Sequence, residues 1–461
     1  IDESMLSGEP QAVEKAAGDK VFAGCINGAS TFTMMVTARS DDSTLANIIR
    51  SVQQAQSAKP PIGQLADTIS AKFVPIVILL AVMVAVLWWW LDTTSLALVA
   101  GVSVLIIACP CALGLATPMS VMVGVGRAAQ SGILIRNGDA LQNAALIDTL
   151  VIDKTGTLTM GAPSVSRVEI SNGVDQQALY TLVRSLEFHS EHTLATALMN
   201  YCQTKGGASS ASVTRINIER GLGLSGIVDK QQVTIGSERF MASLGITVPA
   251  HTNDDGLSVV YVAIDELYAA RFYFHDAIRS DSLAAIQQLQ QQGIECIIVS
   301  GDTETSVANV ARYLNIQRFH ARSLPEDKQA YVANLQRLGK KVAMAGDGIN
   351  DAPALAAADV SFAMSCGTDI AVSTADIALM RNSLSGVAEA IAVSKATIRN
   401  IRQNLFWAFA YNVVSIPIAA GALYPFTGEL LNPMIAGAAM ALSSVTVASN
   451  ANRLRWLSLK T

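Results

Sequence analysis

The stretch Val151-Ile152-Asp153-Lys154-Thr155-Gly156-Thr157-Leu158-Thr159 decides the fold. The apolar residues before Asp153 predict a short strand, and the Gly and Thr residues after it predict a turn with exposed backbone N–H groups. A carboxylate at the carboxyl end of such a strand can attack a phosphoryl group and form an aspartyl phosphate. An Asp after a strand is, on its own, more often a turn residue, so this interpretation depends on companion residues elsewhere.

Companion residues occur in three later segments. Ser300-Gly301-Asp302 follows an expected apolar strand, Lys328 closes the sequence Pro-Glu-Asp-Lys, and Gly346-Asp347-Gly348-Ile349-Asn350-Asp351 follows another expected strand. Together they supply a hydroxyl group, a cation that neutralises charge and two carboxylates for Mg²⁺, which in-line phosphoryl transfer requires. We therefore predict a phosphoryl-transfer site with Asp153 as its nucleophile.

The composition indicates that part of the chain lies in lipid. Of its 461 residues, 51% are hydrophobic and only 15% are charged, which is too apolar for an ordinary soluble protein. Four apolar stretches are long enough to cross a bilayer, which takes about 20 helical residues. They lie at 73–90, 96–118, 405–426 and 431–449. Their spacing predicts two hairpins, each with a short turn.

Basic residues predict the orientation of these hairpins. The two turns contain no Lys or Arg, whereas the outer flanks of the hairpins are basic. The flanking residues are Arg50, Lys59, Lys72, Arg127, Arg136, Arg399, Arg402, Arg453 and Arg455. The positive-inside rule therefore predicts that both turns lie outside and that the block between the hairpins lies in the cytosol.

The block between the hairpins has roughly 280 residues, more than one compact domain usually holds. Its ends, at 146–159 and 293–364, alternate apolar strands with Gly-Asp turns and helical runs, as in a doubly wound α/β sheet. The middle, about 161–278, has strand and helix signals of its own and is interpreted as an insertion. The segment 1–40 has alternating patterning that predicts part of a small β-rich domain.

The net charge and the cysteine content limit the kinds of partner and ligand that the protein can bind. The net charge of −5, without a basic run interleaved with aromatics, argues against a nucleic-acid partner. Six cysteines lie far apart except for Cys109 and Cys111, which excludes a secreted disulfide framework and suits a metal site in a reducing compartment. The chain begins at Ile1 without an initiator Met or signal peptide, so we interpret it as a fragment.

The close cysteine pair predicts a metal site in a membrane helix. In a regular helix Cys109 and Cys111 would point about 200° apart, but Pro110 removes an N–H group and unwinds the helix locally. Both sulfurs can then face one ion, and two soft thiolates suit low-coordinate Cu(I). A proline kink with two incidental small residues is the structural alternative.

The motifs at 153–159 and 346–353, Asp-Lys-Thr-Gly-Thr-Leu-Thr and Gly-Asp-Gly-Ile-Asn-Asp-Ala-Pro, are those of P-type ATPases. The chain resembles this family along essentially its whole length. The resemblance implies four transmembrane helices and a haloacid-dehalogenase-like phosphorylation domain (127–160 and 279–395). It further implies an α+β nucleotide-binding domain (161–278), part of an actuator domain (1–50) and membrane hairpins at 51–126 and 396–461.

The resemblance also implies roles for residues in the phosphoryl-transfer site. Asp153 is expected to be phosphorylated, with the transferring group stabilised by Ser300, Gly301, Asp302 and Lys328 and the site completed by Asn350. Mg²⁺ is expected at Asp153, Thr155, Asp347 and Asp351. The family's Thr-Gly-Glu occurs as Ser7-Gly8-Glu9, where Ser keeps the hydroxyl, so Glu9 is expected to position the hydrolytic water.

The nucleotide site is expected in the insertion. The sequence from Glu187 to Ala195 is similar to the Ser-Glu-His-Pro-Leu motif of the heavy-metal branch. The resemblance places ATP near five residues: Glu187, His192, Gly221, Gly223 and Gly236. A His at a helix start is, in isolation, more often a surface residue. Thr193 in place of Pro and Ser237 in place of Asn depart from the family pattern and leave ATP affinity in question.

The later helices are similar to those of copper pumps at Tyr411, Asn412, Met440 and Ser444, although the polar residues there can also serve helix packing. We expect an ATP- and Mg²⁺-dependent Cu(I) exporter in a cell (inner) membrane, in contact with lipid and supplied by a copper chaperone or thiol carrier. The alternative is a Zn(II)/Cd(II) pump, which is expected to add an intramembrane Lys or Asp that 405–449 lacks. The membrane spans argue against a soluble phosphatase, and the phosphoryl-transfer residues against a non-catalytic scaffold.

Overall fold

The computed structural model describes residues 1, 14–22, 25–27, 31–37, 39, 61–91, 94–190, 193–207, 212–219, 222–249, 257–347, 351–364 and 375–459. The chain divides into two compact units. The first comprises Ile1–Thr149, Ala333–Met344 and Leu355–Thr461, and the second comprises Leu150–Val332 and Ala345–Ala354.

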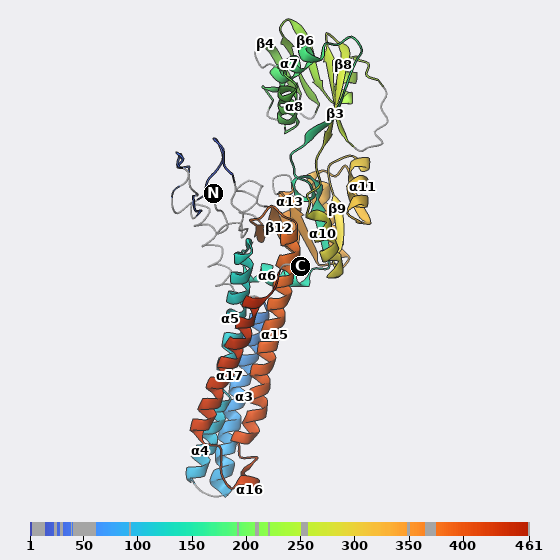
Figure 1. Ribbon diagram of the computed structural model, residues 1–461. Helices are drawn as coiled ribbons and strands as arrows, with labels where there is room; N and C mark the ends of the chain where they lie inside the picture. Colours follow the sequence, from blue (N-terminus) through green and yellow to red (C-terminus); the bar gives the residue numbers. More distant parts are fainter. Residues whose placement is uncertain are drawn as a thin grey trace. The chain divides into compact units, whose positions relative to one another are not determined.

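Long helices of the first unit run alongside one another as a bundle (Figure 1). They are α3 (Pro61–Leu91), α4 (Thr94–Ile107), α5 (Cys111–Gln130), α15 (Ser385–Ala419) and α17 (Pro433–Asn452). Helix α3 packs on α4, and α5 packs on both α15 and α17. Small buried residues such as Ala100, Ala116 and Ala436 let the backbones approach closely. The Trp88 indole donates to Ala420 O at 3.0 Å and ties α3 to the end of α15.

Three helical segments among the described residues are long and apolar enough to cross a membrane: Pro61–Leu91, Ser95–Gln130 and Pro433–Trp456. Three of the four predicted spans fall on them. The remaining span, 405–426, begins on α15 and reaches the short helix α16 (Tyr424–Thr427). Polar residues such as Gln403, Asn404 and Asn412 lower the hydropathy of α15, so the count of four spans stays a prediction.

A seven-stranded sheet has the order β1-β13-β12-β11-β2-β9-β10. Its strands are β1 (Ile133–Ile135), β2 (Thr149–Asp153), β9 (Glu295–Val299), β10 (Arg318–His320), β11 (Val342–Gly346), β12 (Val360–Met364) and β13 (Ile377–Leu379). The accompanying helices are α6 (Gly138–Leu146), α10 (Ser282–Gln291), α11 (Glu304–Tyr313), α12 (Pro325–Arg337) and α13 (Ala352–Ala357). Pairs β9–β10 and β12–β13 are parallel, and the edge pair β1–β13 is antiparallel. The predicted doubly wound α/β sheet is confirmed.

The second unit also contains a six-stranded sheet with the order β3-β8-β7-β6-β5-β4, whose neighbouring strands are all antiparallel. Its strands are β3 (Ser164–Ile170), β4 (Val213–Glu219), β5 (Gly223–Val228), β6 (Gln231–Gly236), β7 (Ser258–Ile264) and β8 (Leu267–His275). Helices α7 (Gln176–Glu187) and α8 (Thr193–Thr204) cover one face (Figure 1), and α9 (Glu238–Ser243) follows β6. This sheet has its own core around Tyr180, Leu198 and Phe272, as an inserted α+β domain requires.

Only parts of the amino-terminal segment are among the described residues. Residues 14–22, 25–27 and 31–37 contain no strand, and only Ile26 is an isolated bridge residue. The predicted water-positioning Glu9 lies outside the described residues.

Candidate phosphoryl-transfer and metal-transport sites

Asp153 is the last residue of the fully buried strand β2. A tight turn, η2 (Lys154–Leu158), follows it, and Gly156 within this turn has a φ of 74°. This is a left-handed conformation that favours glycine. A Cβ at Gly156 would also lie 3.2 Å from Asp347 Oδ2. The glycine therefore brings the Asp347 carboxylate close to the nucleophile turn.

Lys328 joins two carboxylates beside this turn. Its Nζ donates to Asp153 Oδ1 at 2.5 Å and to Asp351 Oδ1 at 2.7 Å. The three side chains are 7%, 8% and 1% exposed. Burial raises the pKa of Asp153 to about 7, with Asp351 adding to the rise and Lys328 opposing it. Burial alone would lower the pKa of Lys328. The Asp153 and Asp351 carboxylates have the larger, opposite effect, so the pKa of Lys328 is raised and its ammonium stays charged.

Ser300, Gly301 and Asp302 lie at the end of β9, the neighbour of β2 in the sheet. The Asp302 carboxylate pairs with the buried ammonium of Lys154. Ser300 is buried, its Oγ accepts from Asp302 N at 3.3 Å, and its N donates to His320 O at 2.9 Å. Adjacent strand ends thus place the predicted hydroxyl and carboxylate next to the turn that carries Asp153.

The carboxylates suit a hard divalent cation. Asp351 Oδ2 is buried and has no hydrogen-bond partner among the described residues. An oxygen in that state is costly unless it meets a cation or water. Asp153, Asp347 and Asp351 carry oxygen donors of the kind that Mg²⁺ prefers, but the described residues do not bring three of them into one metal-binding group, so their role as Mg²⁺ ligands stays a prediction. Thr155 is exposed in the same turn, and Asn350 lies outside the described residues.

Two residues that sequence reasoning missed support the nucleophile turn. The buried Arg279 guanidinium donates to Gly156 O at 2.9 Å and to Thr157 O at 3.1 Å. Asp276 accepts from Thr159 Oγ1 at 2.6 Å and from Gly161 N at 3.1 Å. An Asp and an Arg three residues apart after a strand were the available signal, but nothing in the sequence showed that this segment returns beside the turn.

The predicted nucleotide residues lie on neighbouring elements of the inserted domain. Glu187 ends α7, which packs on β5, and burial raises the pKa of its carboxyl to about 7 while Ser190 opposes the rise. Gly223 and Gly236 are direct partners across β5 and β6. A Cβ at Gly223 would lie 2.7 Å from the Gly236 Cα, so neither position has room for a side chain. His192 and Gly221 lie outside the described residues.

One of the two departures from the family motif has a local explanation. Ser237 is the N-cap of α9, and its Oγ accepts from Phe240 N at 3.2 Å. A serine hydroxyl satisfies a helix N-terminus as well as an Asn side chain does. Nothing in the structure explains Thr193 at the start of α8.

The predicted break in the membrane helix is confirmed, because α4 ends at Ile107 and α5 begins at Cys111. Cys109 and Cys111 have Cα atoms 5.5 Å apart and are joined by a disulfide, and their role as metal ligands stays a prediction. Pro110, with φ −81° and ψ 36°, directs both sulfurs to one point. A metal ion at this point requires the pair to be reduced first, because the thiolate is the ligand.

The other predicted metal residues lie on the two helices that pack against α5. Tyr411 and Asn412 are on α15, and Met440 and Ser444 are on α17. Asn412 is 5% exposed, and its side chain makes no hydrogen bond among the described residues, whereas Ser444 Oγ donates to Met440 O at 3.4 Å. No group of three or more His, Cys, Asp or Glu that could hold a metal occurs in the described part of the chain.

A buried polar network connects the same three helices, and sequence reasoning missed it. Ser120 Oγ donates to Asn400 Oδ1 at 2.9 Å, and Asn404 Nδ2 donates to both Ser120 Oγ and Asn400 Oδ1 at 3.1 Å. Asn450 Nδ2 donates to Asn404 Oδ1 at 2.8 Å, and its carbonyl accepts from Asn400 Nδ2 at 2.9 Å. The network joins α5, α15 and α17.

Family models match most of the chain. A haloacid dehalogenase-like hydrolase family matches residues 147–359, a second such family matches 328–391, and the P-type ATPase actuator domain matches 1–53. The actuator match agrees with the expected role of the amino-terminal segment.

Curated relatives are metal-exporting P-type ATPases by name. A copper-exporting P-type ATPase of Legionella pneumophila is 47% identical over the whole chain, which covers 63% of that protein. One from Vibrio cholerae is 46% identical over 99% of the chain and 51% of its own length. A silver exporting P-type ATPase of Salmonella typhimurium is 44% identical over 99% of the chain and 56% of its length. The chain thus spans about half to two thirds of these relatives.

A solved zinc-transporting PIB-type ATPase in an E2.Pi state has a similar structure, with a TM-score of 0.69 and 31% identity. The match covers 98% of this chain and 74% of that one. Its extent, together with the phosphoryl-transfer residues and the broken Cys-Pro-Cys helix, shows that the chain belongs to the heavy-metal P-type ATPases.

Proposed function

We propose that the complete protein exports Cu(I) across a membrane at the expense of ATP, through an aspartyl phosphate on Asp153. The observation that carries this proposal is the buried Asp153–Lys328–Asp351 group at the end of β2. A buried carboxylate held by one lysine, next to a second carboxylate with an oxygen that has no partner among the described residues, suits reversible phosphorylation better than a structural ion pair.

In the proposed reaction an Asp153 oxygen attacks the γ-phosphorus of ATP, and the bond from that phosphorus to the β–γ bridging oxygen breaks. ADP leaves with the bond's electron pair. Lys328 favours the ionised form of Asp153 against the effect of burial and offsets charge on the transferring group, while Arg279 fixes the turn through its bonds to two carbonyls. Mg²⁺, held by Asp153, Asp347 and Asp351, would neutralise phosphate charge. Glu9 is proposed to direct the water that later hydrolyses the aspartyl phosphate.

Cu(I) is the cargo we favour over Zn(II). The named relatives are copper and silver exporters, and Cys109, Cys111 and Met440 are soft sulfur ligands. Zn(II) prefers a tetrahedral shell of N, S or O donors. The similarity to the solved zinc transporter keeps Zn(II)/Cd(II) export as the second candidate.

The proposed setting is a cell (inner) membrane with the soluble domains in the cytosol. The three membrane-capable segments and the basic flanks support it. A copper chaperone or thiol carrier is the proposed donor, because free Cu(I) would otherwise bind any accessible thiol.

A metal panel on the complete protein tests the proposal. With a thiol reductant present, Cu(I) and Ag(I) are expected to stimulate ATP hydrolysis and Zn(II) is not.

Cys109→Ser and Cys111→Ser should each lose the metal-dependent activity, since a hydroxyl is a far weaker ligand for a soft ion, yet both should still be labelled by inorganic phosphate. Asp153→Asn should lose all acid-stable labelling. If Zn(II) stimulates ATP hydrolysis as much as Cu(I) does, the assignment of Cu(I) as the cargo is wrong. If the Asp153→Asn protein is still labelled, another residue is phosphorylated.

A further inference from the structure

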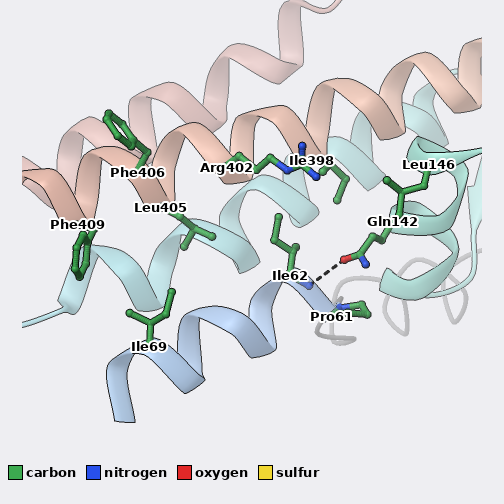
Figure 2. A pocket seen from close by; sticks show the side chains of 10 residues that line it. All are labelled: Pro61, Ile62, Ile69, Gln142, Leu146, Ile398, Arg402, Leu405, Phe406 and Phe409. Atoms are coloured by element: carbon green, nitrogen blue, oxygen red, sulfur yellow. Dashed lines mark hydrogen bonds between the residues drawn. The ribbon is translucent and has the colours of Figure 1, made fainter. Parts of the chain in front are cut away.

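A groove with a volume of about 550 Å³ lies on the outside of the helix bundle, at the start of α3. Its walls come from α3, α6 and α15 (Figure 2). The side chains that line it are apolar except for Gln142 and Arg402. The Gln142 side chain already has a partner within the protein, because its Oε1 accepts a hydrogen bond from Ile62 N at 2.9 Å.

Among the described residues that line this groove, Arg402 is the one that carries a charge. Its guanidinium is exposed and makes no hydrogen bond or ion pair with any described residue. Figure 2 shows the side chain extending along α15 toward the end of the groove where Gln142 and Leu146 lie. A guanidinium that has no partner among the described residues and lies among apolar side chains favours an anion that it can bind through two parallel hydrogen bonds.

The opposite end of the groove is wholly apolar. Ile69 lines it from α3, and Phe406 and Phe409 line it from α15 (Figure 2). The Phe409 ring contacts that of Phe73 on α3 with centroids 5.6 Å apart, which joins the two helices there. From Arg402 to Phe409 the helix rises about 10 Å, the length of several methylene units of an acyl chain.

The sequence places this groove at the cytosolic surface of a membrane. Arg402 lies three residues before the predicted span 405–426, and Ile69 lies on the membrane-capable helix Pro61–Leu91. Basic pockets between helices at that level bind anionic lipid headgroups. A soluble anion would leave the exposed apolar part, including the 64% exposed Phe406, without an occupant.

We propose that this groove binds one anionic phospholipid, with its phosphate on Arg402 and an acyl chain along Ile69, Phe406 and Phe409. The charge at one end and the apolar walls at the other match the two halves of such a lipid. The proposal does not depend on which metal the protein exports.

Native mass spectrometry of the delipidated complete protein in detergent tests this site. Phosphatidylglycerol is the anionic probe, phosphatidylcholine the zwitterionic probe and inorganic phosphate the headgroup alone. The unmodified protein is expected to bind one phosphatidylglycerol at least tenfold more tightly than phosphatidylcholine, as expected for a charge-assisted hydrogen bond. Arg402→Gln should lose this preference.

Arg399 provides a matched control, because it is an exposed arginine one turn earlier on α15 that does not line the groove. Arg399→Gln should keep the tenfold preference, and Ile69→Trp, which fills the apolar part, should weaken the binding of both lipids. Three results would each overturn the proposal: equal losses in Arg399→Gln and Arg402→Gln, full displacement of the lipid by inorganic phosphate, or no lipid bound by the unmodified protein because another segment fills the groove.

Discussion

At the scale of single residues, the end of β2 gathers groups that would repel or destabilise one another in isolation. Asp153 and Asp351 are both buried, and the ammonium of Lys328 lies between them. The sequence predicted this gathering, since strands of one sheet end at the same edge. It did not predict Arg279 or Asp276, because their contacts with the turn depend on how the chain returns from the inserted domain.

The raised pKa of Asp153 predicts a pH-dependent stability. The folded-state pKa of about 7 lies above the ordinary value of 3.8, so the folded protein holds this proton more tightly than the unfolded chain. The contribution is complete below the ordinary pKa and is lost as pH rises through about 7. We expect the free energy of unfolding to fall over this window by about 4 kcal/mol at most from this group.

Denaturant unfolding between pH 4 and pH 8 measures this contribution. Asp153→Asn cannot ionise, so its unfolding free energy should decline less with pH than that of the unmodified protein. Asp139→Asn, an exposed change in the first turn of α6, should keep the original slope. Identical slopes in all three proteins would show that Asp153 titrates alike in the folded and unfolded states.

At the scale of elements, the membrane helices are specified partly by sequence and partly by packing. Pro110 predicted the break between α4 and α5, because proline clashes with the preceding turn. The 35 residues of α15 were not predicted as one helix, since only its second half forms a long apolar stretch. The amide network of Asn400, Asn404 and Asn450 was also missed, because its members are adjacent only after α5, α15 and α17 have packed.

This network predicts a coupling between helix register and metal response. Asn404→Leu keeps the side-chain size but removes three hydrogen bonds, at a cost of about 2 kcal/mol at the average worth of such bonds in membranes. The metal concentration for half-maximal ATP hydrolysis is expected to rise several-fold, because α15 and α17 carry Asn412 and Met440. Labelling by inorganic phosphate should persist.

Gln403 is the control for that change, since it is an exposed neighbour on the same helix. Gln403→Leu should leave the metal response as it was. If both leucine variants shift the metal response equally, the effect belongs to the helix surface. If Asn404→Leu loses phosphate labelling as well, the network supports the general fold rather than the metal site.

At the scale of the whole molecule, the inserted domain begins and ends at one place. Met160 N donates to Ala277 O at 2.9 Å, and Thr159 and Ile278 form an isolated antiparallel bridge. The sequence predicted an insertion at 161–278, because its strand signals differ from those on either side. It could not show that the two connections would pair, since that contact joins residues more than a hundred positions apart.

Paired connections predict that the insertion folds alone. Its core around Tyr180, Leu198 and Phe272 is internal to it, and closely spaced ends are typical of domains that tolerate excision. The fragment 161–276 should unfold cooperatively in urea, and it should bind ATP through the segment that contains Glu187. A fragment without a cooperative transition would contradict this expectation. Glu187→Gln, compared with the exposed change Glu266→Gln, separates a loss of ATP binding from a loss of folding.

The pairing of Thr159 with Ile278 also has a mechanical consequence. Two chain segments that are hydrogen-bonded side by side bend together more easily than they twist around each other. Asp276 links the second connection to the first, because it accepts hydrogen bonds from Thr159 and Gly161. We therefore expect the inserted domain to move mainly by bending of the two connections together, at a place within a few residues of the turn that carries Asp153.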